Sequence, residues 1–184
     1  MSDDPVQTRL LTAEHGWLDF QDYFVRRQCR PTVRQFAFEG AERARPHPEF
    51  LVALRDERLR GVVICPSNPF ISVEPILALP GVRAALAACA APVIAVSPII
   101  GVRAVKGPTA KMMRELGLEA TASSVARRYG DLLDGFVLDE ADRGTVDLGV
   151  RAFFTGTLMT NVAEKEALAR TVLDAADTLT SEMR

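Results

Sequence analysis

The sequence lacks several features that would assign it to common classes of protein. Three of its 184 residues are cysteines, Cys29, Cys65 and Cys89, and their odd number and wide spacing exclude a disulfide framework or a CxxC metal site. Its longest apolar runs are interrupted by Pro, Gly or Arg, which leaves no transmembrane helix. The acidic start MSDDPVQTR does not have the basic-then-apolar order of a secretory signal. We therefore expect a cytoplasmic protein.

An excess of charge and the familiar catalytic motifs are missing as well. The formal net charge is -2, so nothing draws the whole chain to nucleic acid or to an anionic membrane. No GxGxxG, GxxxxGK[ST], HxxxH or HExxH pattern occurs. The two histidines, His15 and His47, lie in predicted loops, and no Ser/His/Asp arrangement can be assembled. The catalytic residues are therefore left unassigned.

The cysteines suggest no obvious chemistry. Cys65 ends an apolar run and Cys89 falls on an apolar helix face, so we expect both to be small buried side chains. Cys29 lies among arginines, which can lower the pKa of a thiol, but no partner base is near it in the sequence.

Apolar strand patterns alternate with helical patterns along the chain. Predicted strands cover residues 6–11, 33–39, 62–65, 93–96, 135–138 and 151–155. Predicted helices cover about residues 18–28, 46–59, 81–90, 111–116, 121–133 and 162–179, with Asp19 capping the first and Ser123 or Ser124 the fifth. The length favours one domain over residues 1–184. Such alternation predicts an α/β fold, three-layered, with a mainly parallel Rossmann-like sheet and helices on both faces.

The most informative stretch covers residues 61–108. It contains two apolar runs with a helical segment between them, which predicts a βαβ crossover with buried parallel strands. The first run ends in Pro66-Ser67-Asn68-Pro69 and the second in Ser97-Pro98. Ligands in open α/β sheets bind beyond the carboxyl ends of the strands. Both loops therefore lie where a ligand is expected.

Each loop also has an ordinary structural explanation. The two prolines fix the backbone while Ser67 and Asn68 present a hydroxyl and an amide, which suits a phosphate or ribose. Ser, Asn and Pro are equally frequent in plain turns. Lys106 precedes a predicted helix, where an ammonium and unpaired amides act on the same anion. A solvated surface lysine is the more common case.

Charged residues elsewhere give two further hypotheses. Arg26 and Arg27 lie in the last turn of a predicted helix, where they either complement the helix C-terminus or bind an anion. Asp3 and Asp4 open the chain, and the acidic segment 139–142 follows the third apolar strand of the sheet. Both groups offer the oxygen ligands that magnesium prefers, although acidic loop residues are usually only solvated.

Several motifs in order resemble one enzyme family. CPSNPFISVEPILALPGVRAAL, APVIAVSPIIGVRAVKGPTAKMMRELG and SSVARRYGDLLDGFVLDE are similar to the central and C-terminal portion of the 2-phospho-L-lactate transferases of coenzyme F420 biosynthesis. MSDDPVQT, FQDYFVRRQCRPTVRQFAFEGA and TGTLMTN fit the same pattern. The resemblance implies transfer of a phospholactyl or phosphoenolpyruvyl group from a guanosine-diphosphate-linked donor to the deazaflavin Fo. Release of GMP and a requirement for Mg2+ are implied with it.

The resemblance also implies the residues of the site. Its nucleotide-binding positions correspond here to Ser67, Asn68, Pro69, Ser72, Ser97, Lys106 and Gly107. Arg26 and Arg27 are implied as anion or substrate contacts in the same cleft. The metal ligands stay unassigned, with Asp3 and Asp4 as candidates.

One departure from the family pattern limits these expectations. Full-length members begin with a strand and a glycine-rich loop, and neither occurs in this sequence. We therefore expect a sheet that is incomplete relative to the family, and a chain that alone is inactive or weakly active. Its exposed sheet edge predicts a homodimer or poor solubility. The alternatives are a non-catalytic nucleotide- or nucleotide-sugar-binding module and a relative that serves only as an oligomerisation partner.

Overall fold

A parallel sheet of four strands lies at the centre of the computed structural model, which describes residues 1–101, 103–104, 107–144 and 148–182. Across the sheet the order is β4 (Val62–Ile64), β5 (Val93–Val96), β8 (Gly135–Asp139) and β9 (Arg151–Thr155). All neighbouring pairs in it are parallel. The crossover between β4 and β5 and the two later strands are therefore confirmed.

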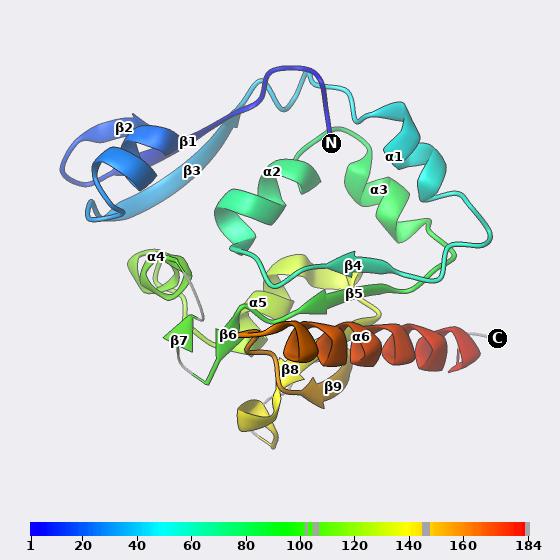
Figure 1. Cartoon of the computed structure of the whole chain (residues 1–184). Coiled ribbons are helices and arrows are strands. Elements are labelled where there is room, and N and C mark those ends of the chain that lie inside the picture. Colours follow the sequence, from blue (N-terminus) through cyan, green and yellow to red (C-terminus); the bar gives the residue numbers. More distant parts are fainter. Residues whose placement is uncertain (102, 105–106, 145–147, 183–184) are drawn as a thin grey trace.

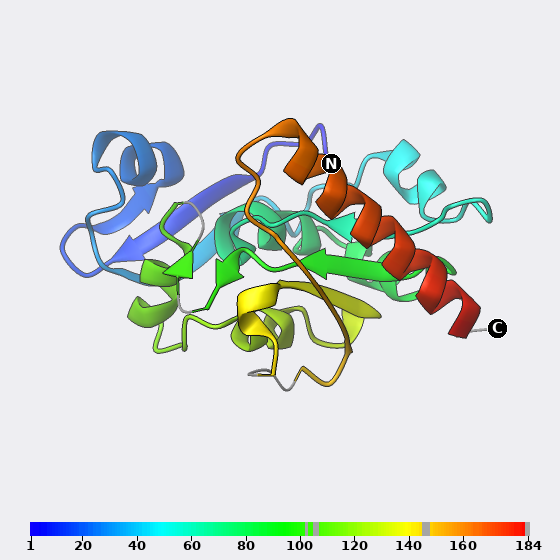
Figure 2. The ribbon, with the colours of Figure 1, turned by 60° about the horizontal axis from the view of Figure 1, so that its bottom comes forward.

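Helices cover both faces of this sheet. In β5, Val93 and Ala95 face one core, whereas Ile94 and Val96 face the other, because successive side chains of a strand alternate. The long helix α6 (Val162–Glu182) packs over the second face. The first face is covered by α2 (Glu74–Leu77), α3 (Val82–Ala87) and α5 (Ala122–Tyr129), as Figures 1 and 2 show. The three-layered α/β fold is confirmed.

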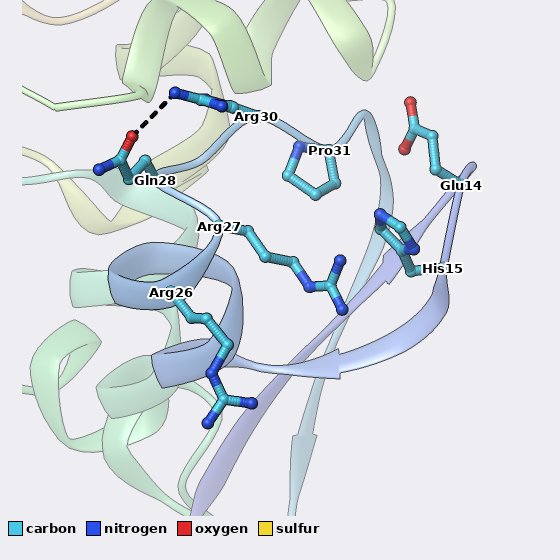
Figure 3. Close-up of a pocket in the computed structure, with 7 residues that line it drawn as sticks. All are labelled: Glu14, His15, Arg26, Arg27, Gln28, Arg30 and Pro31. Atoms are coloured by element: carbon cyan, nitrogen blue, oxygen red, sulfur yellow. Dashed lines mark hydrogen bonds between the residues drawn. The ribbon is translucent and has the colours of Figure 1, made fainter.

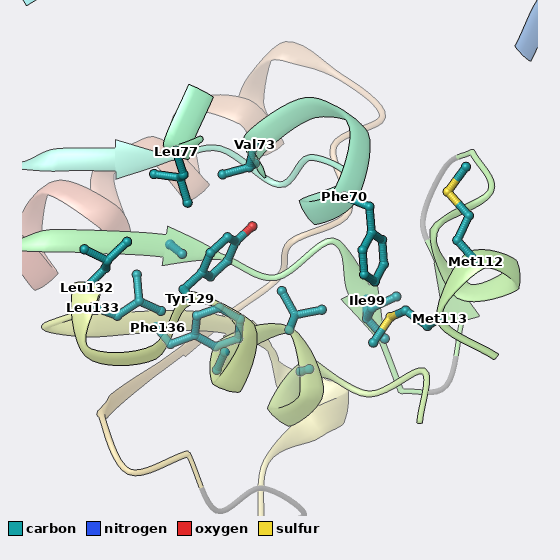
Figure 4. Packing of buried hydrophobic residues seen from close by; sticks show 14 of the residues in the cluster. Phe70, Val73, Leu77, Ile99, Met112, Met113, Tyr129, Leu132, Leu133 and Phe136 are labelled. Carbon is teal, nitrogen blue, oxygen red and sulfur yellow. The ribbon is translucent and has the colours of Figure 1, made fainter. Parts of the chain in front are cut away.

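The larger core fills the space on the first face. Figure 4 shows Phe136 of β8 beside Tyr129 of α5, with Leu77 of α2 on the other side of Tyr129 and Phe70 and Ile99 farther along. Phe70, Tyr129 and Phe136 are at most 2% exposed. This packing fixes the position of the loops that follow β4 and β5, because Phe70 and Ile99 lie within those loops.

A second sheet is antiparallel and separate from the first, which corrects the prediction of a mainly parallel sheet for this part of the chain. Its order is β2 (Gly16–Asp19), β1 (Gln7–Thr12) and β3 (Val33–Glu39). Parallel neighbours require a crossover of a dozen or more residues, whereas a tight turn joins β1 directly to β2 as an antiparallel hairpin. The sheet lies at one end of the molecule (Figure 1).

The helix predicted over residues 18–28 begins later than expected. Leu18 pairs with Leu10 in the hairpin, so the ladder takes up the backbone that the prediction had assigned to a helix. Asp19 forms an ion pair with Arg9 at 3.0 Å and does not cap a helix. The helical part ends in a π-helical turn, Asp22–Arg26.

Other boundaries differ in smaller ways. The helix α1 (Pro48–Ala53) is shorter than predicted, and the cap of α5 is Thr121, whose Oγ1 accepts a hydrogen bond from the Ser124 amide at 3.2 Å. Cys65 is exposed, contrary to the prediction, because it follows the edge strand β4, and Cys89 is half-buried. Burial raises the pKa of the Cys29 thiol, so the lowered pKa is wrong as well.

Short elements connect the two sheets. A ribbon of β6 (Ile99–Ile100) and β7 (Arg103–Ala104) precedes α4 (Thr109–Glu115). The α4 helix contacts the antiparallel sheet. Lys111 Nζ donates to Pro31 O at 2.8 Å, and the Val33 amide donates to Glu115 Oε2 at 3.0 Å. Within the described ranges, no helix is long and apolar enough to cross a membrane.

Candidate functional site

A small cleft lies where the loops after β4 and β5 meet. Its volume is about 120 Å³. Its wall consists of residues from four segments that are distant in sequence: Pro66, Asn68, Ser97, Pro98, Thr109, Thr157, Leu158 and Met159. The carboxyl ends of neighbouring parallel strands meet at one edge of a sheet, which explains why these loops converge. The cleft therefore occupies the ligand position predicted from the sequence.

Asn68 shapes the first loop from within. Its Oδ1 accepts hydrogen bonds from the amides of Phe70 at 2.9 Å and Ile71 at 3.3 Å. Its Nδ2 donates to Met112 Sδ at 3.4 Å, which ties the loop to α4. The side chain thus caps the π-helical turn Pro69–Val73, in which Pro69 is buried. The turn interpretation of this loop is confirmed, and the ligand interpretation stays a prediction for a capped loop that borders the cleft.

Ser97 has a similar role in the second loop. It is fully buried, and its Oγ donates to Ile99 O at 2.8 Å and accepts from the Ile99 amide at 3.1 Å. The Ser97 amide donates to Val137 O at 2.9 Å and extends the pairing of β5 with β8. The hydroxyl therefore holds the turn that places Pro98 against the cleft.

A threonine that the sequence analysis did not select completes the cleft. Thr157 is 3% exposed, and both its amide, at 2.8 Å, and its hydroxyl, at 3.1 Å, donate to Asp139 Oδ2. Burial alone raises the pKa of Asp139, but these bonds and one from the Ala141 amide outweigh it, so the pKa lies below its ordinary value. The signal for Thr157 was its place just after the last strand, in the TGT of the motif TGTLMTN.

Thr109 is a further missed residue of the cleft. It is the first residue of α4 and is 2% exposed. Gly107 lies two positions earlier in a turn, with a left-handed φ of +69° that favours glycine. Lys106, predicted beside it, lies outside the described residues. Gly107 therefore lies two residues before Thr109, which lines the cleft.

Two of the predicted serines line a different cavity. Ser67 and Ser72 border a hollow of about 270 Å³ between β4, α3 and the residue Phe50, together with Met1 and several apolar side chains. A third hollow, of about 520 Å³, lies between β4 and α6 and shares Pro66 and Met159 with the cleft. The loop after β4 therefore separates three adjoining spaces. Asn68 and Ser97 share one of them, and the predicted serines 67 and 72 do not.

The arginine pair lies elsewhere again. Arg26 and Arg27 line an open pocket of about 600 Å³ with Glu14, His15, Gln28, Arg30 and Pro31, none of which borders the strand-end cleft. Figure 3 shows the Arg27 side chain pointing between Pro31 and His15, while Arg26 points away from them. Arg27 Nε donates to Asp22 Oδ2 at 2.8 Å, and this bond holds the pKa of that carboxyl below its ordinary value. The structure therefore does not bring these arginines to the cleft.

Of the candidate metal ligands, Asp3 and Asp4 do not line the cleft, and Asp139 touches it only through its bonds to Thr157. Asp4 Oδ2 accepts from the Arg45 amide at 2.8 Å, and Asp3 lies 3.8 Å from His47. Asp142, in the segment after β8, accepts from the Gly101 amide at 3.0 Å, and its burial raises its pKa. Across the described parts of the chain, no group of three or more His, Cys, Asp or Glu side chains is arranged to hold a metal ion.

Comparison with known proteins adds a family match. Residues 1–153 match the family described as 2-phospho-L-lactate transferase CofD. A 2-phospho-L-lactate transferase of Methanosarcina mazei is 41% identical over 179 residues, which cover 95% of this chain and 57% of the relative. A phosphoenolpyruvate transferase of Streptomyces griseus is 37% identical over 185 residues, covering 96% of this chain and 58% of the relative. The chain thus spans less than two thirds of these relatives.

A solved structure shows the same fold. A UPF0052 family protein from Bacillus halodurans aligns with a TM-score of 0.60 at 15% identity, covering 91% of this chain and 59% of that chain. At this identity the likeness concerns the arrangement of the strands and helices alone.

Proposed function

The chain belongs to the 2-phospho-L-lactate transferase CofD family, and from this premise we propose that it is the nucleotide-holding part of a transferase in coenzyme F420 biosynthesis. In this proposal the complete enzyme moves a phospholactyl or phosphoenolpyruvyl group from a GDP-linked donor to the deazaflavin Fo and releases GMP. The observation that carries the proposal is the cleft at the ends of β4 and β5, lined by two capped loops and two buried threonines.

The chemistry of the cleft suits a diphosphate or a ribose. Thr109 and Thr157 belong to its wall. A threonine hydroxyl can donate to a phosphate oxygen or accept from a ribose hydroxyl, but the Thr157 hydroxyl already donates to Asp139 Oδ2 and can only accept from a ligand. The loops of Asn68 and Ser97 are held by internal hydrogen bonds before any ligand arrives. A site arranged in advance loses less conformational entropy on binding. We therefore assign binding and orientation of the nucleotide to these residues.

Magnesium is a prediction from the resemblance that the cleft itself does not support. Its described wall consists of Pro, Asn, Ser, Thr, Leu and Met side chains and contains no carboxylate. Magnesium is usually bound by one or two carboxylates together with substrate phosphates. Asp139 is the nearest candidate by its bond to Thr157, but it already accepts three hydrogen bonds.

The absence of carboxylates from the described cleft wall favours a second candidate. A non-catalytic module that binds a nucleotide or a nucleotide sugar needs hydroxyl and amide groups, and it needs no metal. The two functions differ in their ligands. A transferase of this family is expected to prefer GDP, whereas a nucleotide-sugar-binding module is expected to prefer a UDP-sugar.

Calorimetric titration distinguishes the two candidates. We expect GDP to bind more tightly than UDP-glucose, and Thr109→Val to weaken GDP binding by about tenfold through the loss of one hydrogen bond. The matched control is Thr178→Val, on the exposed face of α6, where the hydroxyl donates to Asp174 O of its own helix. A preference for UDP-glucose would contradict the transferase proposal. An equal loss of GDP affinity in both variants would show that the nucleotide does not bind in the cleft.

A further inference from the structure

A basic pocket lies beside the antiparallel sheet, and the proposed nucleotide site does not use it. Its volume is about 600 Å³, which is within the range of sites for small molecules. None of its described lining residues borders the cleft at the ends of β4 and β5. In the sequence, Arg26 and Arg27 left two interpretations open, complementing a helix end or binding an anion. The contacts of the pocket favour the second.

Arg27 is held with one edge of its guanidinium toward the pocket. Its Nε donates to Asp22 Oδ2 at 2.8 Å, and among the described residues no hydrogen bond or ion pair engages its two Nη atoms. Figure 3 shows the side chain pointing between Pro31 and His15. The Arg27 side chain is 32% exposed, whereas that of Arg26 is 84% exposed. A guanidinium that is fixed at Nε and largely covered keeps its Nη groups for an acceptor that enters the pocket.

The pocket carries more positive than negative charge. Three arginines and a histidine line it, and among the described lining residues Glu14 is the only carboxylate. Both Glu14 oxygens accept from Thr32, Oε2 from the amide at 2.8 Å and Oε1 from the hydroxyl at 2.7 Å. Asp22 forms ion pairs with Arg26 at 3.3 Å and with Arg27 at 2.8 Å. One carboxylate shared by two guanidinium groups leaves an excess of positive charge that attracts an anion.

The loop that follows Arg27 is held in an unfavourable conformation. Gln28 and Cys29 have left-handed φ angles of +52° and +57°, which are uncommon for residues other than glycine. The Cys29 amide donates to Tyr23 O at 3.0 Å, and the hydroxyl of the fully buried Tyr23 donates to Cys29 O at 3.3 Å. Lys111 of α4 fixes Pro31 through the bond to its carbonyl group. Strained backbone persists only where its surroundings impose it, and it is frequent at ligand-binding sites. The pocket is therefore formed in advance of any ligand.

We propose that this pocket binds a phosphate group between the Arg27 guanidinium and the His15 ring. The two Nη atoms of a guanidinium present N–H groups that match two oxygens of a phosphate. An imidazole can donate a further hydrogen bond, and Arg26 and Arg30 add attraction from the rest of the wall. The phosphate is either free or carried by a small organic molecule, for which the pocket has additional space. This site is separate from the proposed nucleotide site and does not depend on it.

The two histidines of the chain make the site observable in solution. His15 lines the pocket, whereas His47 lies outside it, 3.8 Å from Asp3. The chain is titrated with inorganic phosphate, and separately with phenyl phosphate, at constant pH and ionic strength. Proton–nitrogen NMR spectra are expected to show shifts of the His15 ring signals and none at His47, with His15→Gln assigning the signals. Equal shifts at both histidines, or none at His15, would overturn the proposal.

The two probes distinguish the sources of the phosphate. Tighter binding of phenyl phosphate would support an organic phosphate as the ligand, because the ring would occupy the remaining space of the pocket. Tighter binding of inorganic phosphate would support a free anion.

Matched variants locate the contact. Arg27→Gln is expected to weaken phosphate binding by about tenfold or more, because hydrogen bonds to charged groups are the strong ones. Arg30→Gln, which leaves the bond to Asp22 intact, is expected to weaken it by about two- to fivefold. Arg43→Gln removes the same charge at a 90% exposed position outside the pocket and is expected to change little. Urea denaturation checks that each variant is folded. Equal binding by all three variants would overturn the proposal.

A cleft variant separates this site from the nucleotide site. Thr109→Val is expected to weaken GDP binding and to leave the phosphate-induced shift of His15 unchanged, whereas Arg27→Gln is expected to do the reverse. Phosphate binding that is lost in Thr109→Val and kept in Arg27→Gln would assign the anion to the cleft and overturn the proposal. A chain that binds phosphate at His15 but no GDP would support this site and contradict the proposed function alone.

Discussion

Asn68 and Ser97 use their polar groups on their own loops. The Asn68 Oδ1 accepts two amides, and the Ser97 hydroxyl both donates to and accepts from Ile99. A ligand in the cleft would therefore meet the backbone and Thr109 more readily than these two side chains, since the Thr157 hydroxyl also donates within the protein, to Asp139. At the residue scale, the predicted polar residues position the site, and Thr109 and Thr157 offer the hydroxyls that line it.

The cap formed by Asn68 gives a direct prediction. Asn68→Ala removes the acceptor for the Phe70 and Ile71 amides and is expected to lower the free energy of unfolding by about 1 kcal/mol. It should also weaken GDP binding, because the loop loses its preset shape. Asn68→Asp keeps the acceptor and is expected to retain most of the stability. Urea denaturation and calorimetry check the two effects, and an alanine variant as stable as the wild type would contradict the capping role.

Asp139 gives a prediction about pH. Its carboxylate accepts hydrogen bonds from two amides and one hydroxyl, and its pKa in the folded protein lies below the ordinary value of 3.8. A carboxyl whose pKa is lowered by folding stabilises the protein above its unfolded pKa, and this stabilisation is lost as the pH falls through the folded pKa. Asp139→Asn is therefore expected to destabilise the protein by about 1–3 kcal/mol at neutral pH.

The pH series separates the charge from the shape of the side chain. Urea denaturation of wild type and Asp139→Asn should show a constant difference from neutral pH down to about the ordinary pKa, and a decreasing difference below it. Asp131→Asn, at an exposed position, is the matched control and should show little change. A difference that does not decrease in acid would mean that the carboxylate charge contributes nothing.

At the scale of elements, α4 joins the two sheets. Its Lys111 donates to Pro31 O, and its Glu115 accepts from the Val33 amide at the start of β3. Lys111 and Glu115 also form an ion pair with each other. Because Thr109 at the start of the same helix lines the cleft, the antiparallel sheet is connected to the site through one helix. We expect substitutions at this junction to lower the stability of the whole antiparallel sheet.

Glu115→Ala tests that connection. It leaves the amide of the buried Val33 without this acceptor and is expected to lower the free energy of unfolding by about 1.5–3 kcal/mol, since the bond involves a charged group. Hydrogen exchange at the Val33 amide should become faster, and proteolysis should act first within residues 7–39. Glu119→Ala, at an exposed position just beyond α4, is the control. Unchanged exchange at Val33 would show that the strand is held by its own sheet alone.

Boundaries of elements were predictable where a local pattern decides them. The strand 33–39 and the strand 151–155 were predicted with the bounds that the structure shows. The segment 18–28 was predicted as one helix, although Leu18 and Asp19 pair with β1 in a hairpin. Helical spacing of apolar residues does not reveal such pairing, since the competing partner lies on another strand.

At the scale of the molecule, four segments of the described chain converge on the cleft at the ends of β4 and β5. The described wall offers hydroxyl and amide groups but no carboxylate. Transfer of a substituted phosphoryl group depends mainly on positioning and on stabilisation of charge. We therefore expect nucleotide binding and turnover to be separable in this chain.

An assay with the chain alone tests this separation. With a GDP-linked phospholactate donor, Fo and magnesium, we expect no release of GMP above background, while GDP binding is measurable by calorimetry. The Methanosarcina mazei relative at its full length is the positive control. Turnover by the chain alone would show that its own residues suffice for the transfer. A chain that binds no nucleotide would favour a role in assembly only.

The sequence by itself determined the strands of the parallel sheet, the helices α3, α5 and α6, the crossover between β4 and β5, and the positions of the two loops that end them. These features depend on patterns that repeat over a few residues, namely apolar alternation, helical spacing and the breaks made by Pro and Gly. The family also followed from short motifs in a fixed order.

Only the tertiary structure decided which of these residues meet. Asn68, Ser97 and Thr157 share a cleft, whereas Ser67 and Ser72, in the same segment as Asn68, face another hollow. Arg26 and Arg27 line a pocket beside the antiparallel sheet, because their segment follows the hairpin of β1 and β2 and does not belong to the central sheet. Such contacts depend on the register and packing of elements far apart in the chain, which no local pattern encodes.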